Sequence, residues 1–161
     1  MTTPGPDPQP AGPRSRAHQV ADAVSIASDF GALWVAVGVC QVLVGRSPVG
    51  VVVRRLGAAG VTSLVLTRLL KHHFAKPRPD GAPATLARTP SSSGFPSGHT
   101  LAAFVSAVVL PRTSGGRALA LAVAAMVGWS RVVVGHHRCA DVLAGAAVGS
   151  TAGAALAAVL P

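Results

Sequence analysis

The sequence predicts an all-α fold: an integral membrane helical bundle with about five transmembrane helices and a preceding amphipathic segment. Hydrophobic residues make up 50% of the 161 residues, and the mean hydropathy of +0.50 is higher than that of most soluble domains. These residues form runs close to the length, about 20 residues, that a helix needs to cross a bilayer. Because Arg and Lys stand mainly at the ends of the runs, we expect a multi-pass protein of the cell membrane.

The chain is expected to divide into a tail and one membrane domain. Residues 1–16 are rich in proline and have too little apolar surface to offset the entropy lost on ordering. We therefore predict that residues 1–16 form a disordered tail and that residues 17–161 form a single membrane-embedded domain.

The segment from residue 18 to residue 44 changes character part of the way along. Asp22, Ser25 and Asp29 recur at helical spacing on one face, and residues 30–44 are almost all apolar. We predict one long helix over residues 18–44, with its first turns lying at the membrane interface and the remainder crossing the bilayer.

Four further apolar helices are predicted, separated by short breaks and one long loop. Residues 75–98 contain five prolines and three consecutive serines, and a loop of this length is uncommon unless it is functional or disordered. In the last helix Gly145, Gly149 and Gly153 recur every four residues, which favours close packing inside one bundle and, as an alternative, against a second copy. The four helices are expected at residues 49–74, 100–110, 117–134 and 142–160.

Side chains capable of chemistry cluster at the ends of these helices. If successive helices alternate in direction, the end of the second span, the start of the third, the end of the fourth and the start of the fifth face the same side of the membrane. Helix alternation alone therefore predicts that these side chains form a single site. In that order the four ends carry Lys71 with Arg78, residues 97–99, Arg131, and His137 with Asp141.

The most specific local signal is the pair His137 and Asp141. A spacing of four residues is one helical turn, so the carboxylate can accept the Nδ1 proton and leave Nε2 to act as a nucleophile. The neighbouring His136 lacks such a partner, because Ala140 stands four residues after it. A leaving group then needs a proton donor, and His99 at the start of a helix is the candidate.

A phosphoryl group is the electrophile that the surrounding cations fit. Lys71, Arg78 and Arg131 would form a cationic cradle for its oxygens. Ser97 and the backbone N–H groups around Gly98 would add an anion site at a helix N-terminus. Because these cations neutralise the oxygens, we expect neither a metal ion nor another cofactor. The sequence also lacks the Cys-x-x-Cys and His-Glu-x-x-His spacings that are typical of metal sites.

Charged residues at helix ends also have a simpler interpretation. Taken singly, an Arg or Lys there is usually an interface anchor, and we interpret Lys76 and Arg88, among others, in this way. The formal net charge of +9 is compatible with nucleic acid binding, but the distribution of the basic residues is not. They are scattered instead of clustered with aromatic residues, and the chain contains no Tyr, so we expect no nucleic acid partner. Membrane lipids and a phosphorylated lipid substrate are the expected partners.

Three segments of the chain carry residues at the spacings of a known signature. In order they are Lys71-x6-Arg78-Pro79, Pro96-Ser97-Gly98-His99 and Ser130-Arg131-x5-His137-x3-Asp141. From residue 71 to residue 141 the chain therefore resembles the type 2 phosphatidic acid phosphatase superfamily. The resemblance implies a metal-independent phosphatase in which His137 is the nucleophile, His99 the acid and Asp141 the orienting partner of His137. It also implies that phosphate is bound by Lys71, Arg78, Ser97, Gly98 and Arg131.

The resemblance also has implications for topology and substrate. Membrane members of the superfamily typically have six spans, so the first would be absent here or reduced to the amphipathic turns before residue 30. The short form resembles actinobacterial enzymes that act on polyprenyl-linked phosphosugars. We expect hydrolysis of a polyprenyl or glycerolipid phosphate or diphosphate through a phosphohistidine intermediate. The alternatives are a vanadate-dependent haloperoxidase and a non-enzymatic membrane subunit.

Overall fold

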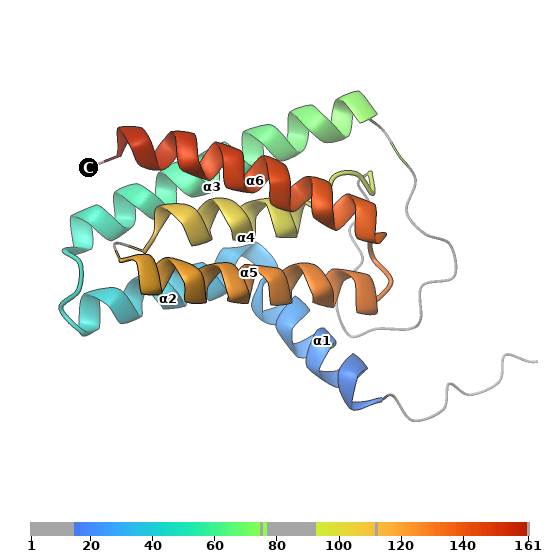
Figure 1. The fold of residues 1–161 in the computed structure, drawn as a ribbon, viewed down its shortest axis with the longest axis horizontal. Helices are drawn as coiled ribbons and strands as arrows, with labels where there is room; N and C mark the ends of the chain where they lie inside the picture. The colour runs from blue at the N-terminus through green and yellow to red at the C-terminus, as the bar shows by residue number, and fades with distance from the viewer. Residues whose placement is uncertain (1–14, 75, 77–92, 112, 161) are drawn as a thin grey trace, which may run out of the picture.

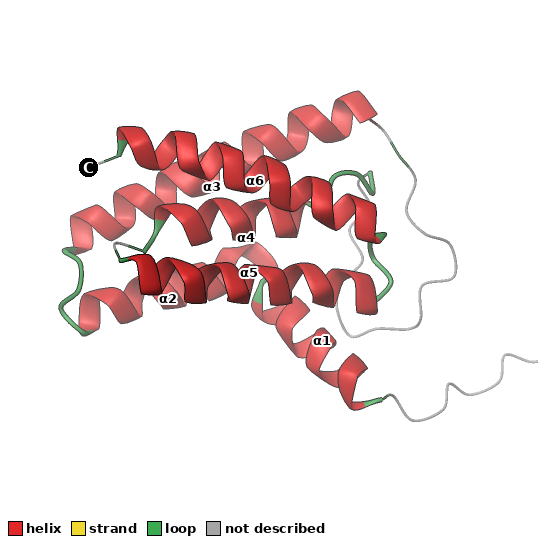
Figure 2. Ribbon diagram, in the orientation of Figure 1, coloured by secondary structure: helices red, strands yellow, loops and turns green. Residues whose placement is uncertain are grey.

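The computed structural model describes residues 15–74, 76, 93–111 and 113–160. Every regular element in this part of the chain is a helix, as predicted (Figure 2). The predicted tail falls almost wholly outside the described residues, and so does most of the predicted loop at residues 75–98. The elements are α1 (Arg16–Ala27), the 3-10 turn η1 (Asp29–Gly31), α2 (Ala32–Leu43), α3 (Val49–Phe74), α4 (Gly98–Val109), α5 (Ser114–Val133) and α6 (Cys139–Val159).

The N-terminal segment is bent. The prediction of one helix over residues 18–44 is wrong, because the chain forms α1, η1 and α2, and the two helices meet at 70°. At the break Gly31 has a φ of +75°, a left-handed conformation that glycine adopts without the steric cost a Cβ would bring. The break places Asp29 in a short turn between two helices instead of on the face of one helix.

α4 is the central helix of the bundle, with α3, α5 and α6 packed around it (Figure 1). Leu101 and Val105 belong to a hydrophobic cluster shared with α3 and α6. Ala103 and Ala107 belong to a second cluster, which α4 shares with α2 and α5. A helix that is buried on most sides is held firmly by its neighbours, so the residues at its N-terminus have a well-defined position.

The glycines of α6 allow it to pack closely against α4. A Cβ on Gly145 would lie 2.7 Å from the Ser97 carbonyl oxygen, and a Cβ on Gly149 would lie 2.5 Å from that of Leu101. Neither distance leaves room for a side chain, so the two backbones approach as closely as glycine permits. The interpretation that this repeat packs inside one bundle is confirmed.

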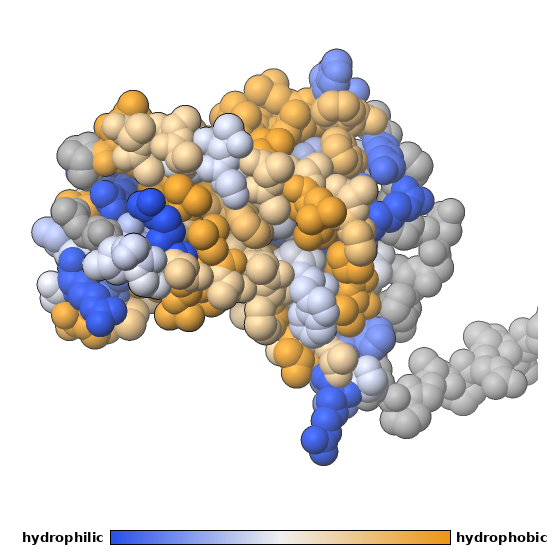
Figure 3. Space-filling view, in the orientation of Figure 1, coloured by the Kyte–Doolittle hydropathy of each residue, from blue (hydrophilic) through white to orange (hydrophobic). Residues whose placement is uncertain are grey.

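The protein is a multi-pass membrane protein. α3, α5 and α6 are each long and apolar enough to cross a bilayer, and the bent pair α1 and α2 would add a fourth crossing if it forms one span. α4 has 12 residues and is shorter than a span, so the predicted number of five crossings stays a prediction. Apolar residues cover the middle of the visible face, and hydrophilic residues lie toward its ends (Figure 3). Large apolar side chains exposed at the bundle surface include Val61, Leu69, Leu119 and Leu143.

Candidate functional site

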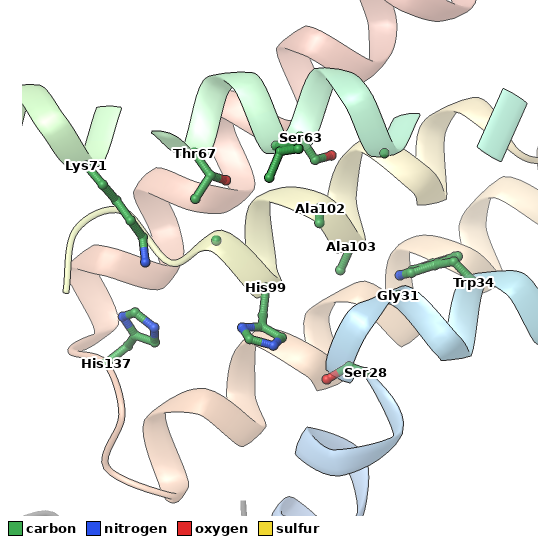
Figure 4. A pocket seen from close by; sticks show the side chains of 13 residues that line it. Ser28, Gly31, Trp34, Ser63, Thr67, Lys71, His99, Ala102, Ala103 and His137 are labelled. Atoms are coloured by element: carbon green, nitrogen blue, oxygen red, sulfur yellow. The ribbon is translucent and has the colours of Figure 1, made fainter. Parts of the chain in front are cut away.

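A cavity of about 480 Å³ lies where α3 ends and α4 begins. Lys71 of α3, His99 of α4 and His137 of the turn between α5 and α6 form its polar end, and their side chains point into the same space (Figure 4). The remaining wall is mostly small or apolar and includes Gly60 of α3 and Trp34 of α2. The cavity therefore joins a cationic, histidine-bearing end to an apolar extension.

The cavity gathers residues from the ends of several helices, as helix alternation predicts. It is lined by four of the eight predicted site residues. Three others are buried at the same end of the bundle, each at most 1% exposed, and Arg78 lies outside the described residues. The four lining residues are Lys71, Gly98, His99 and His137, and the three buried ones are Ser97, Arg131 and Asp141.

His137 is held by a backbone carbonyl. Its Nδ1 lies 2.7 Å from the Gly94 carbonyl oxygen, whereas the nearer Asp141 oxygen, Oδ2, is 3.9 Å away. A carbonyl can only accept, so Nδ1 carries the proton, and in the neutral ring Nε2 carries the lone pair. His137 also precedes α6 instead of lying on it, so the predicted helical-turn geometry between His137 and Asp141 is wrong. Gly94 is 43 residues away in sequence, and no local pattern indicates the contact.

Asp141 is held at the start of α6. Its Oδ2 accepts a hydrogen bond from the Arg138 backbone N–H at 2.8 Å, and its Oδ1 lies 3.5 Å from Lys76 Nζ. A carboxylate in the first turn is favoured by the helix dipole and satisfies a backbone donor of that turn. Lys76, interpreted from the sequence as an interface anchor, is thus part of the site. Only its position in the proline-rich loop close to Arg78 could have indicated this.

His99 contacts Asp29, a residue outside the predicted site. Its Nε2 lies 2.9 Å from Oδ1 of Asp29, in η1. Lys71 and Arg131 are also close enough to interact electrostatically with His99. The available signal for Asp29 was a carboxylate directly before a long apolar run, a position where a charge is costly without a partner.

Arg131 and Ser97, the other two buried residues of the predicted site, are each held by hydrogen bonds. Arg131 is fully buried, and its Nη1 donates a hydrogen bond to the Ser25 hydroxyl of α1. The Ser97 backbone N–H donates to the Asp141 carbonyl oxygen at 2.9 Å, and its hydroxyl accepts from Thr100 at 3.0 Å. The Ser97 contact ties the start of α4 to the start of α6, and Gly98, the first residue of α4, lines the same cavity as His137.

A metal ion has no evident ligand set in the part of the chain that the structure describes. No three His, Cys, Asp or Glu side chains are grouped there as a metal ion would require. The polar end of the cavity instead carries two histidines and Lys71, and Ser28, Ser63 and Thr67 add hydroxyl groups to its wall. This set of donors suits an anion.

Residues 52–161 match the sequence model of the PAP2 superfamily. A lipid A 1-phosphatase of Porphyromonas gingivalis is 38% identical over 88 residues, which are 52% of this chain and 18% of that protein. A decaprenylphosphoryl-5-phosphoribose phosphatase of Mycobacterium tuberculosis is 32% identical over 99 residues, or 61% of this chain and 55% of that protein. The matched region thus spans about half or less of each of these relatives.

Two solved structures share the fold. A transmembrane PAP2-type phosphatidylglycerolphosphate phosphatase from Bacillus subtilis aligns with a TM-score of 0.68 and 28% identity, over 89% of this chain and 76% of that one. LpxE from Aquifex aeolicus aligns with the same TM-score and 24% identity, over 89% and 87% of the two chains. The matched sequence region begins within α3, so α1, η1 and α2 precede it.

Proposed function

The chain belongs to the PAP2 superfamily, and from this we propose that it hydrolyses a lipid phosphate or diphosphate through a phosphohistidine intermediate, without a metal ion. One observation carries the proposal: His137, His99 and Lys71 line one cavity whose other end is apolar. A nucleophile, a proton donor and a cation around one anion are the groups that phosphoryl transfer needs. The apolar end then suits the lipid part of the substrate.

In the first step the lone pair of His137 Nε2 attacks phosphorus, and the bond from phosphorus to the lipid oxygen breaks. The hydrogen bond from Nδ1 to the Gly94 carbonyl supports this role, because it fixes the tautomer and orients the ring. His99 gives its proton to the departing oxygen, so the lipid leaves as an alcohol or, from a diphosphate, as a monophosphate. Lys71 and Arg131 offset the charge on the phosphoryl oxygens, with Arg78 expected to assist.

In the second step water attacks the phosphohistidine and the bond between nitrogen and phosphorus breaks. His99, now neutral, takes the proton from the attacking water and returns to its starting state. Inorganic phosphate leaves, and His137 regains its lone pair. Asp141, 3.9 Å from His137 Nδ1, stabilises the positive charge that the ring carries while it is phosphorylated.

The proposed substrate class follows from the shape of the cavity and from its relatives. Beyond the polar end the wall is built from small residues together with Trp34 and Leu64, and the outer surface of the bundle exposes large apolar side chains. The relatives are named for phosphate groups on lipid A, on a decaprenylphosphoryl sugar and on phosphatidylglycerol. The proposed substrate is therefore a phosphate or diphosphate of a polyprenyl lipid or of a glycerolipid.

Phosphate release by the purified protein tests the proposal. In detergent with a chelator present, we expect release from at least one of a polyprenyl diphosphate, a polyprenyl phosphosugar and phosphatidate. His137→Ala should abolish it, whereas His72→Ala should not, because His72 is exposed on α3 and does not line the cavity. A wild-type protein inactive on all three lipids, or a His137→Ala protein of equal activity, would overturn the proposal and favour a non-enzymatic subunit.

A further inference from the structure

We infer that Asp29 is a positioning residue that acts through His99, so the bend before the matched family region is part of the active site. The inference rests on the proposed function, because it concerns how the proposed acid is held. Its basis is the 2.9 Å contact between Asp29 Oδ1 and His99 Nε2. The two side chains are about equally exposed, 24% and 25%, so the pair lies at the edge of the cavity and not on the open surface.

The contact determines which nitrogen of His99 can serve the substrate. A carboxylate accepts and cannot donate, so the hydrogen between the two side chains is on Nε2. In a protonated ring the second proton is then on Nδ1, and one ring nitrogen of His99 does face His137 across the cavity (Figure 4). The geometry thus assigns the Nδ1 proton to the leaving oxygen and the Nε2 proton to the hydrogen bond that orients the ring.

The bend of the chain is what carries Asp29 to this position. Ser28 and Gly31, on either side of η1, line the cavity together with His99, and η1 also packs against α4. A second contact fixes the same segment: Ser25, one turn before η1, accepts a hydrogen bond from Arg131. Two site residues on different helices, His99 and Arg131, are therefore both contacted by a segment that precedes the matched region.

The charge of Asp29 also suits its surroundings. Lys71 and Arg131 both interact electrostatically with His99, and a phosphorylated substrate would add negative charge on the other side of the ring. A carboxylate next to His99 offsets part of the positive charge of the two cations when the substrate is absent. Asp29 contacts His99 and is not among the residues that line the cavity, so it can hold the ring without itself contacting the phosphoryl group.

The test compares Asp29→Ala with wild-type protein on two substrates. For a lipid phosphate the leaving group is an alkoxide that needs a proton, so we expect kcat to fall about tenfold to a hundredfold with KM little changed. For p-nitrophenyl phosphate the leaving group needs no proton, so we expect kcat/KM, which reports formation of the phosphohistidine, to change less than about threefold. Hydrolysis of the intermediate still uses His99 with either substrate, so kcat/KM is the quantity compared between them. Asp29→Asn should recover part of the loss, because its amide oxygen can accept the same N–H.

A double-mutant cycle on the lipid substrate separates positioning from a general effect on the fold. In a His99→Ala background we expect Asp29→Ala to cause no further loss, since the group it positions is already gone. Losses that multiply, or equal losses of kcat/KM on both substrates, would overturn the inference. An active wild-type enzyme with unchanged Asp29→Ala would overturn the inference alone, whereas an inactive wild-type protein would overturn the proposed function as well.

Discussion

At the scale of single residues, the site depends on hydrogen bonds that hold two imidazole rings. His137 is held by the Gly94 carbonyl and His99 by the Asp29 carboxylate. The sequence motifs supply both rings, but each partner comes from another part of the chain, 43 residues away for Gly94 and 70 for Asp29. Because local spacing carries no information on such contacts, the sequence could predict the reactive groups and not what orients them.

Asp141→Asn is a test at this scale. Since the Gly94 carbonyl already fixes the His137 tautomer, we expect kcat to fall about tenfold to a hundredfold, less than where an Asp is itself the tautomer-fixing partner. The amide oxygen of Asn can still accept from the Arg138 N–H, so the melting temperature should change little. Turnover equal to that of the wild type would show that the carboxylate charge has no role.

At the scale of elements, the sequence predicts the helices with clear boundaries well and the bent segment poorly. The predicted span at residues 49–74 agrees with α3, because Pro48 precedes its apolar run and proline-rich sequence follows it. The sequence does not predict the break between α1 and α2, because a single glycine in an apolar run is compatible with a continuous helix. Only the structure shows that Gly31 is left-handed and that the break brings η1 to α4.

The close approach of α4 and α6 also gives a test at this scale. Gly149→Ala would place a Cβ 2.5 Å from the Leu101 carbonyl oxygen, so we expect a loss of about 1 to 3 kcal/mol in stability. Gly57→Ala is the matched control, since its added Cβ meets no atom within 4 Å and should leave stability unchanged or slightly raised. Thermal unfolding of the purified proteins in detergent measures both, and equal melting temperatures would contradict the packing.

At the scale of the whole molecule, alternating helix directions create the site. The ends of α3 and α5 and the starts of α4 and α6 lie at one end of the bundle, although their polar residues are spread over residues 71 to 141. This convergence could be predicted from parity alone. Burial of α4 at the centre could not, because its sequence is as apolar as that of helices that face lipid.

The apolar exterior and the polar cavity have separate roles at this scale. Exposed large hydrophobic side chains on α3, α5 and α6 favour residence in the bilayer, and the cavity between helices holds the polar groups away from it. A lipid substrate could therefore keep its chain in apolar surroundings while its phosphate meets Lys71 and the two histidines.

Trapping of a covalent intermediate shows whether His137 is the nucleophile. In protein mixed with a lipid substrate that carries a radiolabelled terminal phosphate and quenched within one turnover, we predict an acid-labile, alkali-stable label that peptide mapping assigns to His137. His99→Ala should retain more of it with an activated aryl phosphate, because the base for its hydrolysis is missing, and His137→Ala should show none. Phosphate release with no label on the protein at any time, or a label on another residue, would exclude His137 as the nucleophile.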